Sequence, residues 1–100
     1  MESAQQEPVD NEEFEQLIVI MKSRSDLTDK ESKDTRLKLY SAGRQGKFGD
    51  NNDPKPGMFD IVGKMKWNAW KDRAGQDQEA CKREFIEMAK AILAKDTKKH

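Results

Sequence analysis

The sequence predicts an all-α protein, a bundle of four helices in one domain. Apolar residues recur at i, i+3, i+4 and i+7 in several stretches, which is the period of an amphipathic helix. Charged residues make up 38% of the 100 residues and hydrophobic residues only 34%, so most of each element must face water. This composition suits a small helical bundle better than a sheet. We expect the domain at residues 10–96, between a flexible polar arm at 1–9 and a polar tail at 97–100.

The first helix is expected at residues 10–23. Asp10 followed by Glu13 is typical of a capping box, in which side chains satisfy the free backbone N–H groups of a helix start. The apolar stripe that follows is Phe14, Leu17, Ile18 and Met21.

The second helix is expected to begin between residues 28 and 34 and to end near Phe48. Thr28 and Glu31 form a second capping-box pattern in this highly charged segment. Two glycines in the second half of the helix each cost about 1 kcal/mol relative to alanine, so this half is predicted to be the weaker one.

The third helix is predicted at about 60–74, with Asp60 as its N-cap and Gly75 as a stop signal. Asp77 is predicted to cap the fourth helix, which runs to about Lys95. The apolar residues of this last helix are Cys81, Phe85, Met88, Ala89 and Ile92.

A long loop at residues 48–59 separates the second and third helices. Its sequence GDNNDPKPG contains too much Gly, Asn, Asp and Pro for a helix or a strand. Basic and aromatic residues flank the loop: Tyr40, Arg44, Lys47, Phe48, Lys55, Lys64, Lys66, Trp67 and Trp70. Lysines beside aromatic rings suit a ligand with an anionic end and an apolar end.

Catalytic groups are scarce. The only histidine is the terminal His100, and the only cysteine, Cys81, lies on an apolar stripe where we expect it to fill the core. A zinc site therefore lacks ligands. Asp50, Asn52 and Asp53 resemble the start of a calcium loop, but the glycine and glutamate that such a loop requires are missing. We predict no enzyme activity, no catalytic residue and no metal site.

The formal net charge is zero, which argues against a nucleic-acid partner. No apolar run approaches the about 20 residues that span a bilayer. The acidic N-terminal segment lacks the apolar stretch of a signal peptide, and a single cysteine forms no intrachain disulfide. We expect a cytoplasmic protein without an integral membrane segment.

The stretch from Gly49 to Trp70 resembles the signature of the acyl-CoA-binding protein family, GD-x-N…PGM-x-D…GK-x-KW-x-AW. The matching residues are Gly49, Asp50, Asn52, Pro56, Gly57, Met58, Asp60, Gly63, Lys64, Lys66, Trp67, Ala69 and Trp70. The resemblance implies the family's four-helix up-down-down-up bundle. It also implies a monomeric, non-catalytic carrier that binds medium- to long-chain acyl-CoA thioesters, needs no cofactor and serves acyl-CoA-using enzymes.

The resemblance also implies a ligand site. Tyr40 and Lys66 match a tyrosine and a lysine of the family site. Arg44 stands where lysine is usual, and its planar fork suits phosphate oxygens. Gly43 and Phe85 stand where the family has tyrosines. The full set of ligand-binding residues implied is Lys22, Tyr40, Ser41, Ala42, Gly43, Arg44, Lys66 and Phe85.

The sequence alone leaves two questions open. Trp70 is expected to be a buried anchor, whereas for Trp67 a core role and a ligand role are equally supported. The alternative function is a helical interaction module that binds a protein or an anionic membrane surface and has weakened or lost acyl-CoA affinity.

Overall fold

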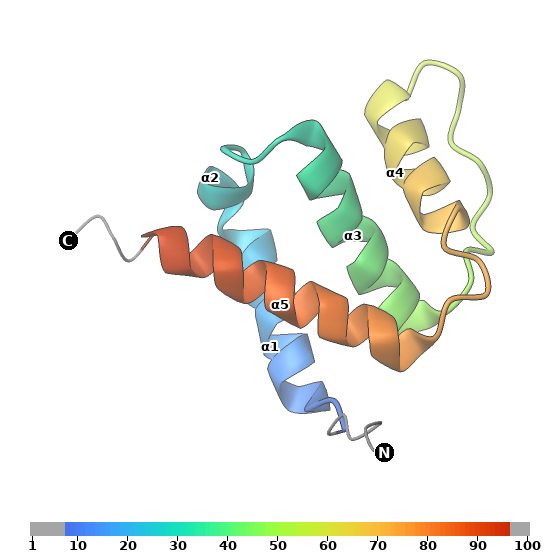
Figure 1. Cartoon of the computed structure of the whole chain (residues 1–100). Helices are drawn as coiled ribbons and strands as arrows, with labels where there is room; N and C mark the ends of the chain where they lie inside the picture. The colour runs from blue at the N-terminus through green and yellow to red at the C-terminus, as the bar shows by residue number, and fades with distance from the viewer. Residues whose placement is uncertain (1–7, 97–100) are drawn as a thin grey trace.

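The computed structural model describes residues 8–96, and every regular element in this range is an α-helix (Figure 1). The helices are α1 (Asn11–Ser23), α2 (Ser25–Thr28), α3 (Lys33–Phe48), α4 (Ile61–Lys71) and α5 (Gln78–Asp96). The all-α prediction is confirmed, and α1, α3, α4 and α5 correspond to the four predicted helices. Most of the predicted N-terminal arm, residues 1–7, and the predicted tail at 97–100 lie outside the described residues.

Three helix starts follow from local signals, as predicted. Asp10, Asp60 and Asp77 each accept a hydrogen bond from the backbone N–H three residues later, at 3.1, 2.9 and 2.9 Å. Each bond satisfies one of the N–H groups that a helix start leaves without a partner. Just before α1, Val9 donates its N–H to Glu79 Oε2 at 3.1 Å and packs against the core.

The short helix α2 corrects the prediction for the segment between the first two long helices. Leu27 is buried in the core, and winding residues 25–28 into a helical turn brings it there. The Thr28 hydroxyl donates to Ser25 O at 3.3 Å within this turn, so the predicted capping box at Thr28 is wrong. Ser32 caps α3 instead, accepting a hydrogen bond from Thr35 N at 3.1 Å.

The third predicted helix is also shorter than expected, because α4 ends at Lys71 rather than at residue 74. The chain beyond it continues in turns closed by backbone bonds between residues three apart. These turns lead to Gly75, whose φ of 85° is a left-handed conformation that glycine adopts readily.

Helix α3 lies at the centre of a flat molecule that measures 45 × 40 × 21 Å. It packs against α5 on one side and α4 on the other, and α1 packs against α5 (Figure 1). The chain runs up α1, down α3, down α4 and back along α5 (Figure 1). The core consists of Phe14, Leu17, Met21, Leu27, Leu39, Ala42, Phe85, Ile86, Ala89 and Ile92. Within residues 8–96, none of the helices combines the length and apolarity that a bilayer span requires.

The loop between α3 and α4 is fastened to α4 by both tryptophans. Trp70 is buried as expected and donates its indole N–H to Gly49 O at 2.8 Å. Trp67 donates its indole N–H to Asp53 O at 2.9 Å. Asn51, only 2% exposed, donates its side-chain amide to Trp67 O at 3.1 Å. These bonds hold the loop in place, and they place Trp67 in a structural role.

Candidate functional site

The Tyr40 ring, on the α3 surface, is flanked by two cations. Arg44, one turn later on α3, places its Cζ atom 5.6 Å from the ring centroid. Lys66, from α4, places its Nζ atom 5.3 Å from the same centroid. Both distances fall within the range of a cation–π interaction. The structure therefore brings together three of the residues predicted to bind the ligand. Tyr40, Arg44 and Lys66 form the Tyr40 group.

Arg44 is held mainly by aromatic rings. Its Cζ atom lies 4.9 Å from the ring centroids of both Phe48 and Trp70. Its Nη2 atom lies 3.8 Å from Asp53 Oδ2, a loose ion pair. The Nε atom is buried and, among the described residues, has no hydrogen-bond partner. The rings contact the guanidinium without accepting hydrogen bonds from it, so its terminal N–H groups, on Nη1 and Nη2, remain able to donate to an anion.

Gly43 lies beside the Tyr40 group, where α3 approaches α5. A Cβ atom built on Gly43 would lie 3.2 Å from two ring carbons of Phe85 and 3.8 Å from Ile18 Cδ1. The Phe85 ring is only 5% exposed and contacts Phe14 edge to face, with centroids 5.5 Å apart. Phe85 is thus mainly a core residue. Its ring lies beneath the bare backbone of Gly43.

Lys22 lies on α1, one turn beyond Ile18. Residues four apart share a helix face, so Lys22 and Ile18 lie on the same side of α1. Ile18 approaches Gly43, whereas Lys22 forms no ion pair or ring contact with Tyr40, Arg44 or Lys66 in the described residues, so the structure does not bring it into the Tyr40 group.

Residues 11–89 match the model of the protein family "Acyl CoA binding protein". The chain belongs to the acyl-CoA-binding protein family. This confirms the family and the fold class that the sequence signature implies.

Relatives agree with this assignment. The chain is 41% identical to acyl-CoA-binding protein homolog 1 of Caenorhabditis elegans over 64 residues, which is 64% of this chain and 74% of the relative. It is 41% identical to a Drosophila melanogaster acyl-CoA-binding protein homolog over 69 residues, 69% of this chain and 80% of the relative. It is also 34% identical to human enoyl-CoA delta isomerase 2 over 59 residues, 59% of this chain but 15% of the human protein.

Solved structures of family members share the fold. The crystal structure of acyl-CoA-binding protein 2 of Oryza sativa superposes with a TM-score of 0.73 at 29% identity, covering 90% of this chain and 97% of the rice chain. The acyl-CoA-binding protein of Moniliophthora perniciosa gives 0.74 at 31% identity, covering 89% of this chain and 85% of the other.

In this family member, two of the predicted ligand-binding residues point elsewhere. Ala42 is fully buried in the core, and Ser41 is buried on another side of α3. The Ser41 hydroxyl donates to Lys38 O at 3.2 Å and accepts from Arg73 Nε at 2.7 Å. The structure therefore does not bring the side chains of Ser41 and Ala42 together with Tyr40.

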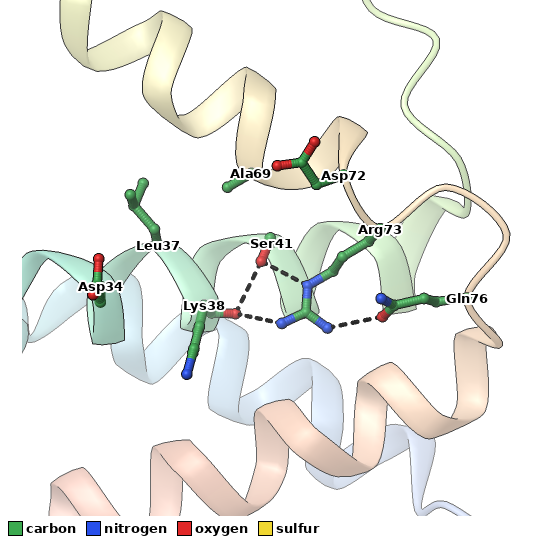
Figure 2. Close-up of a pocket in the computed structure, with 8 residues that line it drawn as sticks. All are labelled: Asp34, Leu37, Lys38, Ser41, Ala69, Asp72, Arg73 and Gln76. Carbon is green, nitrogen blue, oxygen red and sulfur yellow. Dashed lines mark hydrogen bonds between the residues drawn. The ribbon is translucent and has the colours of Figure 1, made fainter.

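Arg73 borders a second candidate site, a hollow of about 330 Å³ (the second hollow) that lies between α3, α4 and the segment leading into α5 (Figure 2). It forms a bidentate ion pair with Glu84, with N–O distances of 3.0 and 2.8 Å. Arg73 also donates to Ser41, to Lys38 O and to Gln76 (Figure 2). The hollow is lined by Asp34, Leu37, Lys38, Ser41, Ala69, Asp72, Arg73 and Gln76.

Electrostatics around Arg73 are those of a structural group. Its hydrogen bonds hold the pKa of Glu84 below the ordinary value. Burial raises the pKa of the neighbouring Cys81 thiol, and this cysteine is buried, as predicted. In the described part of the chain, no group of three or more His, Cys, Asp or Glu side chains is arranged to hold a metal ion.

Sequence reasoning missed two residues near these sites. Asp53 is considered from the sequence only as a loop residue and as part of a rejected calcium-loop pattern, yet its carboxylate forms an ion pair with Arg44. Arg73 belongs to no motif, and its partner Glu84 lies 11 residues away. Neither pairing has a helical or strand spacing that would reveal it.

Proposed function

We propose that this chain is a non-catalytic carrier of medium- to long-chain acyl-CoA thioesters. The observation that carries the proposal is the Tyr40 ring flanked by Arg44 and Lys66. The family match over residues 11–89 supports it and does not favour the alternative, an interaction module that has lost acyl-CoA affinity.

In this proposal the cations bind the phosphates of CoA. Arg44 offers a planar fork with free N–H groups, and Lys66 offers a point charge that forms no ion pair with any described residue. Lys22 adds a third cation from α1. Hydrogen bonds to charged groups contribute about 1.5–3 kcal/mol each. These contacts select the thioester of CoA over a free fatty acid.

The acyl chain supplies most of the affinity. Burying one CH₂ contributes about 0.8 kcal/mol, so the carbons of a fully covered palmitoyl chain contribute about 12 kcal/mol. Val62 is 59% exposed and lies four residues before Lys66, on the same side of α4. We propose that the acyl chain covers Val62 as it leaves the cations.

The nucleotide end has fewer polar contacts than the family pattern implies. Gly43 and Phe85 stand at positions where tyrosines are usual, so two hydroxyl groups are missing. The backbone of Gly43 is itself buried against the Phe85 ring, so neither residue replaces the missing hydroxyl groups. We therefore expect the acyl chain to determine a larger share of the affinity here.

The proposed carrier function also implies where the protein works and what it binds. The human isomerase relative matches this chain over only 15% of its length, so its enzymatic name is not carried over to this chain. We propose a cytoplasmic monomer without a cofactor, which exchanges its ligand with acyl-CoA-using enzymes and binds no nucleic acid.

Calorimetric titration with palmitoyl-CoA and acetyl-CoA tests this function. We expect one palmitoyl-CoA per chain and much weaker acetyl-CoA binding. Lys66→Glu should weaken palmitoyl-CoA binding at least about tenfold, because it removes a charged contact and adds repulsion. Lys64→Glu is the matched control, since Lys64 lies two residues earlier and points to a different side of α4. Equal affinity for both ligands, or equal effects of both variants, would contradict the proposal.

A further inference from the structure

Asp53 is the counterion of the cationic group around Tyr40. Its Oδ2 atom lies 3.8 Å from Arg44 Nη2, and the two side chains are 57% and 35% exposed. Within residues 8–96, no other carboxylate lies within ion-pair distance of Arg44 or Lys66. One acidic side chain therefore faces a cluster that would otherwise be purely cationic.

The backbone of Asp53 is fixed from two sides. Its N–H donates to Asn51 Oδ1 at 2.9 Å, and its carbonyl accepts the indole N–H of Trp67 at 2.9 Å. Asn51 is in turn buried and bound to the backbone of α4. The loop thus holds the carboxylate beside Arg44, where only rotation of the side chain can remove it.

We propose that Asp53 competes with the ligand's phosphate for Arg44 and so limits affinity and speeds release. This inference rests on the proposed function. The pair is long and partly exposed, so it is weak enough for a phosphate to displace. Once a phosphate contact opens, the carboxylate is already in position to pair with Arg44 again. A carrier that must hand over its ligand gains faster exchange from such an internal competitor.

An opposite role predicts the opposite result. If the Asp53 pair instead positioned Arg44 for the ligand, its removal would weaken binding. The three aromatic rings around Arg44 already hold the guanidinium, so positioning does not require Asp53.

The test compares Asp53→Asn with Asp72→Asn, which removes the same charge beside the second hollow. Palmitoyl-CoA affinity is measured by calorimetry and dissociation by stopped flow. Asp53→Asn should raise affinity about two- to fivefold, with slower dissociation, because exposed ion pairs contribute at most about that factor. Asp72→Asn should change neither quantity. In an Arg44→Met background, Asp53→Asn should have no effect.

Pyrophosphate serves as a second probe that needs no acyl chain. Its affinity, followed by the NMR signal of the Arg44 side-chain N–H, should also rise in Asp53→Asn. If the wild type bound no palmitoyl-CoA while this rise occurred, the proposed function would fail and the competition would stand. Unchanged or weaker binding of both probes in Asp53→Asn would overturn the competition, as would the same gain in Asp72→Asn or with Arg44 absent.

Discussion

Two arginines have contrasting surroundings: Arg44, which belongs to α3, and Arg73, which lies beside that helix. Arg73 is 11% exposed and donates to Ser41, to the Lys38 carbonyl and to both oxygens of Glu84. Arg44 stacks among rings, has one loose ion pair and keeps a buried Nε without a partner in the described structure. Lys38 and Tyr40, which mark the two environments, are two residues apart on α3 and so face nearly opposite directions.

The different surroundings distinguish an arginine with a structural role, Arg73, from one that is available to bind a ligand, Arg44. The charge and the donors of Arg73 are satisfied by the protein itself, so this arginine stabilises the junction of three helices. Arg44 is oriented by rings that do not neutralise it, so its charge remains for a ligand. A hollow beside a satisfied arginine, as in Figure 2, is therefore a weaker candidate for anion binding than an exposed surface beside an unsatisfied one.

The largest effect expected is on stability. Arg73→Met should lower the free energy of unfolding by about 2–3 kcal/mol, because it leaves Glu84 and Ser41 without their charged partner. Urea denaturation measures this change. Arg44→Met should cost less than about 1 kcal/mol, since its single ion pair is exposed. Equal losses in the two variants would break the contrast between the arginines.

Ligand affinity should show the reverse order. Arg44→Met should weaken palmitoyl-CoA binding about tenfold through the loss of one charge-assisted contact. Arg73→Met should leave the affinity of the folded fraction within about twofold, because Arg73 has no donors to spare. Calorimetry at a temperature well below the unfolding transition gives both values. A tenfold loss in Arg73→Met would place the second hollow in the binding site.

Part of the pH dependence of stability should come from the ion pair between Arg73 and Glu84. The pKa of Glu84 is lowered in the folded protein, so the ion pair stabilises the fold above the ordinary pKa of glutamate. This contribution is lost as the pH falls through the folded-state pKa. Urea midpoints measured towards acid pH should fall more steeply in the wild type than in Glu84→Gln. The pKa of Asp50 is lowered too, by hydrogen bonds from Gly75 and Gln45, so only the difference between the two proteins isolates Glu84.

The smallest effect concerns the Tyr40 ring. Tyr40→Leu should weaken palmitoyl-CoA binding about two- to fivefold, because the two cations lose the ring that lies between them. Tyr40→Phe keeps the ring and should bind nearly as well. A large loss in Tyr40→Phe, measured by the same titration, would show that the hydroxyl rather than the ring contacts the ligand.

Local features of the fold were predictable from sequence. The caps at Asp10, Asp60 and Asp77 depend on residues three apart, so the spacing alone reveals them. The helix α2 was not predictable in this way, because the burial of Leu27 depends on α1 and α5. Helix propensity likewise indicates only that Gly46 destabilises its helix relative to alanine. A Cβ atom there would lie 3.1 Å from the backbone N of Lys82, so Gly46 allows α3 to approach α5 closely.

Some residues of the candidate site were likewise predictable from the sequence, and others were not. Tyr40, Arg44 and Lys66 were predicted through the family resemblance, and the structure brings them together. Ser41 and Ala42 lie within the same run of α3, yet helix geometry turns their side chains away from the site. Asp53 and Arg73 depend on how the loop and the turns fold back, which no short-range pattern encodes.

The two indoles that fasten the loop have a practical consequence. They are the only tryptophans in the chain, and the ring of Trp70 lies 4.9 Å from the Arg44 guanidinium. Tryptophan emission of the unlabelled protein therefore arises entirely from this corner of the molecule. A phosphate that draws the guanidinium charge away from the Trp70 ring will shift that emission, so the protein carries its own optical sensor for occupancy.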